Sequence, residues 1–137
     1  STKLKLYRDG PWIKNLDLLI HYTYAATRDI SSGSDSRLPK WPLHQISTVL
    51  SYQPIESLQA NLEGRYVGER FGNVGNGNPT PSFVVWNLSA SYDVTKSVQA
   101  YLRLDNIFNE KYEETLFFGT PIRSIFGGVR INYDLPL

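Results

Sequence analysis

The sequence of 137 residues contains no cysteine. This absence excludes disulfide bonds, thiolate metal sites and cysteine catalysis. Long apolar runs are also missing, because the richest one, Leu16 to Ile20, is interrupted by Asp17. A transmembrane helix needs about 20 consecutive apolar residues. The chain is therefore not a helical membrane protein, although strands that cross a membrane are still allowed, since they carry their signal as alternation.

An excess of charge of one sign is equally absent. Fourteen basic and thirteen acidic residues leave a net charge of +1, without a lysine or arginine cluster of the kind that follows a phosphate backbone. We therefore expect no nucleic-acid partner. Residues 1–15 carry no apolar signal-peptide core. The first strand pattern begins in mid-alternation, which favours a start inside a longer parent chain.

Aromatic and β-branched residues recur at every second position between clusters of glycine, proline, asparagine, aspartate and serine. This pattern is typical of β-strands, and no segment has convincing helical periodicity. It predicts an all-β fold with seven strands, namely Thr2–Arg8, Ile13–Thr27, Leu43–Gln53, Ser57–Phe71, Ser82–Asp93, Ser97–Phe108 and Ile122–Tyr133.

One face of each predicted strand is more apolar than the other. In the fifth strand, Trp86 and Leu88 alternate with Asn87 and Ser89. A soluble sandwich or a lipocalin buries one face and wets the other in the same way. Alternation alone therefore leaves a soluble binder and a membrane sheet open. The sixth strand shows the pattern over its length, with Val98, Ala100, Leu102 and Leu104 opposite Gln99, Tyr101, Arg103 and Asp105.

Strand length and connection length both favour a membrane sheet. The patterns at Ile13–Thr27 and Ser57–Phe71 exceed the roughly five or six residues usual in soluble sheets, and a tilted membrane strand needs about 9–11. Outer-membrane barrels have short periplasmic turns and long outer loops. Here Arg8–Pro11, Gln53–Glu56 and Asp93–Lys96 are short, and they alternate with the long connections Arg28–Trp41, Gly72–Pro81 and Asn109–Pro121.

Aromatic residues of the apolar face fall near the strand ends. Amphipathic rings favour the membrane interface, because the ring prefers hydrocarbon and its polar tip prefers the headgroups. The pattern therefore predicts two aromatic girdles, although tyrosine is also a good strand former in soluble sheets. The periplasmic set is Tyr52, Tyr92 and Tyr133, and the outer set is Tyr24, Tyr66 and Trp86.

Three segments resemble motifs of one known family. Asp105–Tyr112 (DNIFNEKY) is similar to the N-L-F-(D/N)-x-x-Y stretch that leads into the last outer loop of the TonB-dependent receptors. Gly119–Ile131 (GTPIRSIFGGVRI) is similar to their closing strand, and Arg37–His44 (RLPKWPLH) resembles a lead into a strand. The similarity covers most of residues 13–137 in order and spacing.

The resemblance implies a receptor barrel of about 22 strands in the bacterial outer membrane, with a plugged lumen. Residues 1–137 would form its C-terminal portion, and the plug domain and the segment that engages TonB would lie upstream in the parent. The terminal residue departs from the family, because Leu137 stands where an aromatic residue is usual, and Pro136 would end ladder pairing. The implied partners are outer-membrane lipid and lipopolysaccharide, upstream barrel and plug segments, TonB, and a small nutrient ligand such as an iron–siderophore or cobalamin complex.

Catalytic and metal chemistry find little support. The two histidines, His21 and His44, have parities that place them on opposite faces, His21 inward and His44 at the outer edge. We therefore expect no metal site and no cofactor. Ser47 is close to His44 in sequence but on the other face, which leaves a lipid-hydrolysing barrel enzyme as a minor alternative. Polar-face charges that could meet a plug, or simply a wet lumen, are Glu63, Arg65, Glu69, Arg103, Asp105 and Arg130.

The predicted outer loops hold the candidate ligand-binding residues. Arginine beside aromatic rings suits an anionic, partly apolar ligand such as a metal chelate, because a guanidinium binds carboxylates at two points while rings cover the scaffold. Loop arginines also bind lipopolysaccharide phosphates or keep the loops soluble, so both roles stay open. The candidates are Arg28, Arg37 and Trp41 in the first long loop, Arg70 and Phe71 at the second, and Tyr112, Phe117, Phe118 and Arg123 around the third.

The sequence thus predicts a transmembrane antiparallel β-sheet, the C-terminal segment of a large receptor barrel that takes up a scarce nutrient and is not an enzyme. A complete eight-stranded outer-membrane barrel with a structural or adhesion role is the first alternative, and a soluble lipocalin-like binder is the second. The motifs do not specify the ligand.

Overall fold

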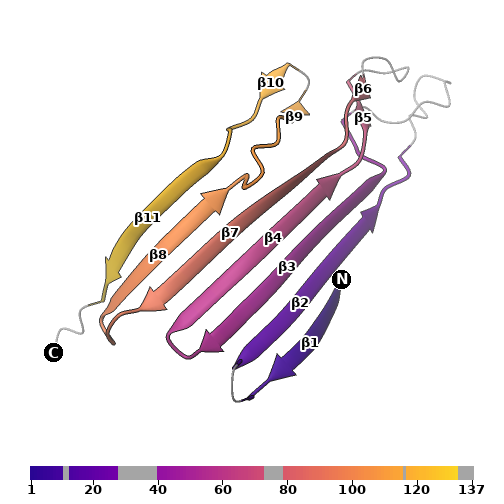
Figure 1. Cartoon of the computed structure of the whole chain (residues 1–137). Helices are drawn as coiled ribbons and strands as arrows, with labels where there is room; N and C mark the ends of the chain where they lie inside the picture. The colour runs from indigo at the N-terminus through magenta and orange to yellow at the C-terminus, as the bar shows by residue number, and fades with distance from the viewer. Residues whose placement is uncertain (11–12, 28–39, 73–78, 116, 133–137) are drawn as a thin grey trace, which may run out of the picture.

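The computed structural model describes residues 1–10, 13–27, 40–72, 79–115 and 117–132. Its main body is one antiparallel sheet whose strands follow one another in chain order, with β1 and β11 at the two edges (Figure 1). This confirms the all-β antiparallel fold. No helix in the described ranges is long and apolar enough to cross a membrane. The seven strands are β1 (Thr2–Arg8), β2 (Asn15–Tyr24), β3 (His44–Ile55), β4 (Leu58–Val67), β7 (Phe83–Asp93), β8 (Val98–Asp105) and β11 (Ser124–Ile131).

Two small hairpins stand at one end of the sheet, which we call the loop end (Figure 1). The first pairs β5 (Arg70–Phe71) with β6 (Pro79–Thr80), and the second pairs β9 (Glu113–Thr115) with β10 (Phe118–Gly119). The connections from β3 to β4 and from β7 to β8 are short and lie at the opposite end, the turn end. Short and long connections are thus sorted to opposite ends, as the sequence predicts.

The fourth predicted strand was wrong as a single element. It ends at Val67, where the Gly68 amide donates to the carbonyl oxygen of His44 at 2.9 Å and the chain leaves the sheet. The sixth ends at Asp105, because Asn106 takes a left-handed conformation with φ 51° and begins a turn. The second, fifth and seventh strands are also shorter than predicted, at Asn15–Tyr24, Phe83–Asp93 and Ser124–Ile131, whereas the third, at His44–Ile55, extends beyond Gln53. Tyr133 lies outside the described residues.

The strand register aligns a row of aliphatic side chains across the whole sheet. Residues directly opposite each other in paired strands share a face, so this row defines the apolar face. Trp86 and Leu102 share it, because Trp86 is two residues from Leu88 and Leu102 pairs with Ala90. From β1 to β11 the row runs Leu4, Leu18, Leu50, Leu62, Leu88, Leu104 and Ile125.

The opposite face of the sheet, the polar face, carries charged and amide side chains. Glu63 pairs with Asn87, and Ser89 pairs with Arg103. Lys3 approaches Asp17 on the same face, with Nζ and Oδ2 at 3.8 Å. The two faces therefore differ in the way that the alternation predicts, and the register of the strand pairs shifts only between Lys5 and Tyr7 of β1 and between Tyr52 and Ile55 of β3 among the described strands of this sheet.

Aromatic residues cluster on the apolar face at the loop end. The Tyr22 hydroxyl lies 2.9 Å from His44 Nδ1, and the Tyr24 and His44 rings are 5.3 Å apart. Towards the turn end, Tyr52 and Tyr92 are exposed on the same face. Tyr24 of the predicted outer set therefore lies towards the loop end, and Tyr52 and Tyr92 of the predicted periplasmic set lie towards the turn end.

Candidate functional site

A small hydrophobic cluster is buried on the polar face near the loop end. Val67, Phe83 and Val85 are only 2%, 4% and 5% exposed, and Val67 and Phe83 pair across β4 and β7. The ring of Tyr112 packs on Phe83 with its centroid 4.3 Å away. Since Tyr112 follows β8 in the chain, the connection between β8 and β11 crosses the polar face here.

Arg70, at the start of β5, is buried beside this cluster, with 7% of its surface exposed. Its Nη1 donates to the main-chain carbonyl oxygen of Glu114 at 2.9 Å, and its Nη2 donates to that of Glu113 at 2.7 Å. The guanidinium carbon lies 5.3 Å from the centre of the Phe83 ring. Burial lowers the pKa of Arg70, and the charge of Glu114 opposes this shift. Arg70 therefore joins β5 to β9.

A second cation supports the same contact. Arg65, on the polar face of β4, forms an ion pair with the carboxylate of Glu114, and its guanidinium carbon lies 5.4 Å from the Phe83 ring centre. Cations over aromatic faces are attracted by the ring quadrupole. Phe83 is thus contacted by two guanidinium groups and by Tyr112.

The segment that resembles the family motif forms a tight turn after β8. Asn106 is 3% exposed, and its side chain bonds both main-chain groups of Glu110, accepting from the amide at 2.8 Å and donating to the carbonyl oxygen at 2.9 Å. Its own amide donates to the Asn87 side chain at 2.9 Å. Asn106 and Asn109 have φ of 51° and 56°, which asparagine tolerates better than most residues. The motif asparagines therefore fix where the loop leaves the sheet.

Phe117 and Phe118 lie at the tip of the β9–β10 hairpin and are 84% and 72% exposed. Phe117 has φ 68°, which is uncommon for a bulky residue and costs conformational energy. Its amide donates to Glu113 Oε2 at 2.9 Å across the hairpin. Both apolar rings are therefore presented to the surroundings by a strained turn that Glu113 holds.

Three more of the predicted loop residues are described by the structure, namely Trp41, Phe71 and Arg123. Trp41 is 58% exposed. Phe71 is half-buried, and its carbonyl oxygen accepts from the Lys40 amide at 2.8 Å. Arg123 is exposed, and its amide donates to the Asn109 side chain at 3.0 Å. Arg28 and Arg37 lie outside the described residues.

Two open hollows flank Tyr112 at the loop end. They have volumes of about 240 and 310 Å³. Of the predicted loop residues that the structure describes, Tyr112 alone lines them. Both hollows share Lys111, Tyr112 and Glu113, and the first adds Pro81, Ser82 and Phe83, whereas the second adds Glu110, Gly119, Thr120 and Ile122.

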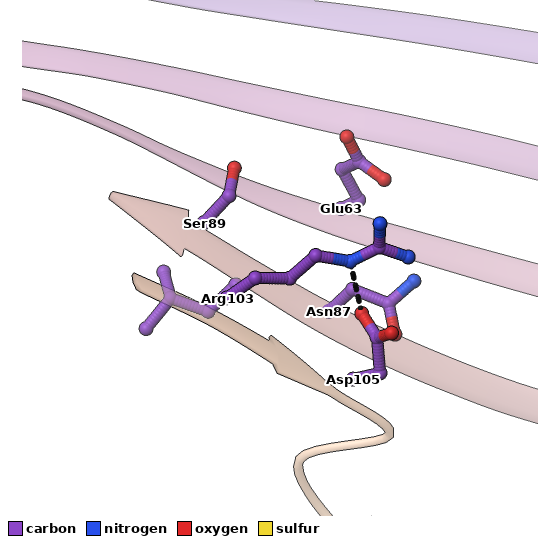
Figure 2. A pocket seen from close by; sticks show the side chains of 6 residues that line it. Glu63, Asn87, Ser89, Arg103 and Asp105 are labelled. Atoms are coloured by element: carbon purple, nitrogen blue, oxygen red, sulfur yellow. Dashed lines mark hydrogen bonds and ion pairs between the residues drawn. The ribbon is translucent and has the colours of Figure 1, made fainter. Parts of the chain in front are cut away.

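A third hollow, of about 250 Å³, lies on the polar face further from the loop end. Arg103 Nε donates to Asp105 Oδ1 at 2.7 Å, and the guanidinium lies between Asp105 and Glu63 (Figure 2). Asn87 and Ser89 complete its polar lining. Its lining contains two carboxylates, Glu63 and Asp105, and one cation, Arg103. The alternation of the sequence predicts all three residues on the polar face.

His44 and Ser47, the histidine and serine that are close in sequence, lie on opposite faces of the sheet. Ser47 pairs across the sheet with His21, a neighbour that spacing along the chain did not reveal. His21 Nε2 lies 3.0 Å from the Thr23 hydroxyl, whereas His44 is on the opposite face against Tyr22. Within the described residues, no group of three histidine, aspartate or glutamate side chains could hold a metal ion.

Comparison with known proteins defines the class. The family described as "TonB dependent receptor-like, beta-barrel" matches residues 4–107, and the chain belongs to this family of bacterial outer-membrane receptors. It is 26% identical over 148 aligned residues to a vitamin B12 transporter, BtuB, of Vibrio vulnificus (strain CMCP6). That alignment covers 93% of this chain and 24% of the transporter, so the chain spans about a quarter of this relative.

Solved structures show the same fold at low identity. The siderophore receptor PiuA of Acinetobacter baumannii superposes with a TM-score of 0.74 and 20% identity, over 86% of this chain and 20% of that one. The ferric enterobactin receptor PfeA of Pseudomonas aeruginosa, in complex with enterobactin, gives 0.72 and 15%, over 94% and 21%. The copper transporter OprC gives 0.71 and 22%, over 93% and 22%. These relatives are receptors and transporters.

Proposed function

We propose that residues 1–137 are the C-terminal portion of the barrel of a receptor that captures a small nutrient complex and passes it inward. The chain covers only about a fifth to a quarter of its relatives. This share supports a parent protein that also carries a plug domain, the other barrel strands and the segment that engages TonB. Outer-membrane lipid and lipopolysaccharide would contact the apolar face.

The main support for this proposal is the path of the chain after β8. In a receptor barrel the polar face lines the lumen, and Tyr112 packs on Phe83 of that face. The connection between β8 and β11 therefore lines the mouth of the lumen, on the route that a ligand must take. The two hollows beside Tyr112 provide concave surface at this place.

The ligand class is supported by the relatives and by the exposed residues. One relative is named a vitamin B12 transporter, and two of the superposed structures are siderophore receptors, one of them holding enterobactin. Among the candidate ligand contacts, Trp41, Phe117 and Phe118 offer exposed rings, and Arg123 offers a cation. We propose that the ligand is an iron–siderophore or cobalamin complex. Tyr112 and Phe71 would lie near it, as would Arg28 and Arg37 of the first loop. Arg70 would act on ligand binding indirectly, through β9.

Uptake of labelled cobalamin and of labelled ferric siderophores by cells that make the intact receptor tests this function. We expect one of these complexes to bind and to enter only in cells that contain TonB. Replacement of both tip residues, Phe117→Ser with Phe118→Ser, should weaken binding without changing the amount of receptor in the membrane. Absence of binding for every complex, or a native membrane protein of only 15.6 kDa, would contradict the proposal and favour a complete small barrel.

A further inference from the structure

Arg70 occupies an unusual position for an arginine in an outer loop. It is buried, and its two terminal nitrogens donate to main-chain carbonyl oxygens rather than to a carboxylate. These oxygens belong to Glu113 and Glu114, more than forty positions further along the chain. The planar guanidinium of arginine holds its donors in a fixed fork and can bind two such acceptors at once. The ammonium group of lysine has no comparable fixed geometry. We call this contact the Arg70 bridge.

The Arg70 bridge continues to the tip of the second hairpin through Glu113. The carbonyl oxygen of Glu113 accepts from Arg70 Nη2 at 2.7 Å, and the carboxylate of the same residue accepts from the Phe117 amide at 2.9 Å. Phe117 depends on such a partner, since its φ of 68° is strained. A chain of two hydrogen bonds therefore leads from the β5–β6 hairpin to the exposed rings.

We propose that Arg70 is a positioning residue that fixes the β9–β10 hairpin over the loop end of the polar face and so sets where Phe117 and Phe118 stand. The two hairpins then behave as one unit, although their strands belong to different connections. Phe83 and the Arg65–Glu114 ion pair assist by holding the guanidinium and β9 from the side. Only the role of the two rings in ligand capture rests on the proposed function.

Distance measurements on the intact receptor without ligand test the bridge. Spin labels at Ser82→Cys and Phe118→Cys report the position of the second hairpin relative to the start of β7, and the chain contributes no cysteine of its own. Double electron–electron resonance should give one narrow distance peak for the otherwise unchanged protein. Arg70→Ala and Arg70→Lys should both lose this peak, whereas Arg8→Ala, at an exposed arginine of β1, should keep it.

Glu114→Gln separates the bridge from the neighbouring ion pair. This change removes the charge that pairs with Arg65 but leaves both carbonyl oxygens, so the narrow peak should persist. A narrow peak in Arg70→Ala or Arg70→Lys, or its loss in Glu114→Gln to the same extent, would overturn the proposal. Because no ligand is present, these outcomes do not depend on whether the receptor transports the complex proposed above.

Hydrogen exchange on the unsubstituted receptor provides a test that does not depend on the folding of variants. If the bridge joins the hairpins, amides of β5–β6 and of β9–β10 should open together and show one common protection free energy. Clearly different protection in the two hairpins would contradict a joint unit.

Discussion

At the scale of single residues, Trp86 lies across Gly64 on the apolar face. A Cβ added at Gly64 would lie 2.7 Å from ring atom Cζ3 of Trp86, closer than real contacts allow. Glycine is therefore required here by the close approach of a large ring, in spite of its cost in a strand interior. Gly64 pairs with Thr48 on one side and with Trp86 on the other. The Trp86 ring fills the space that a side chain at Gly64 would occupy.

Gly64→Ala should destabilise the intact receptor by about 1–3 kcal/mol, because either the ring or the strand must move. Gly127→Ala is the matched control, since a Cβ at this strand glycine would meet its nearest atom at 3.6 Å, an ordinary contact. Urea unfolding in lipid vesicles measures both. Equal losses for the two variants would show that Trp86 does not pack on Gly64.

Leu102 lies on the apolar face near the middle of β8, where a substitution tests whether this face meets lipid. It pairs with Ala90 and Gly127 and is 44% exposed in the isolated sheet. An arginine at a lipid-facing position near mid-membrane costs about 2–4 kcal/mol, so Leu102→Arg should lower the free energy of unfolding by this amount. Gln99→Arg, on the polar face of the same strand, should cost far less. Equal losses would mean that the sheet does not lie in the membrane.

At the scale of elements, the turns at the turn end are joined by an ion pair. Lys14 Nζ donates to Glu56 Oε1 at 3.0 Å, so the start of β2 is tied to the β3–β4 turn. The hydrogen bond and the charge of Lys14 lower the pKa of Glu56 below its ordinary value of 4.5. The same contacts with Glu56 raise the pKa of Lys14 above 10.5.

These shifts predict a pH window for local order. The stabilisation that Glu56 contributes is complete above about pH 4.5 and is lost as the pH falls through its lowered pKa. The stabilisation that Lys14 contributes is complete below about pH 10.5 and is lost as the pH rises through its raised pKa. Protection of the Lys14 amide, which donates to Gln53 at 2.9 Å, should therefore fall in acid. Glu56→Gln should remove this acid dependence, and unchanged dependence in the variant would assign it to another group.

The long strands could be predicted from sequence because their alternation repeats over many residues and shares one period. The β5–β6 and β9–β10 hairpins could not, since two or three residues such as Arg70–Phe71 or Phe118–Gly119 are too short to show any period. Arg70 was predicted as a loop cation for ligand. Arg70 is buried where the chain after β8 returns and packs Tyr112 on Phe83. The local sequence pattern does not reveal this long-range contact. The contact of Arg70 with ligand stays a prediction.

At the scale of the whole molecule, the sheet has two edges. β1 and β11 each pair with one neighbour among the described strands. Each edge presents a row of unpaired backbone groups, and in hydrocarbon every unsatisfied group costs several kcal/mol. Bacterial single-chain barrels avoid this cost by closing with an even number of strands. The seven-stranded sheet therefore needs neighbouring strands on both sides.

The 137 residues alone should not form a closed, monomeric barrel. Refolded in detergent, the isolated chain should associate through β1 and β11, and light scattering after size-exclusion chromatography would show species larger than a monomer. The intact receptor, treated identically, should be monodisperse. A heat-modifiable monomer of the isolated chain with barrel-like circular dichroism would contradict this expectation.

In the proposed receptor, the apolar face meets lipid and the polar face meets the water-filled or plugged lumen. Nitroxide labels placed singly at Trp86, Leu102, Asn87 and Arg103 of the intact receptor in vesicles test it, with one lipid-soluble and one water-soluble relaxation agent. We expect labels at Trp86 and Leu102 to respond to the lipid-soluble agent, whereas those at Asn87 and Arg103 should be shielded from it. Shielding of Trp86 and Leu102 from the lipid-soluble agent would contradict the assignment of this face to the membrane.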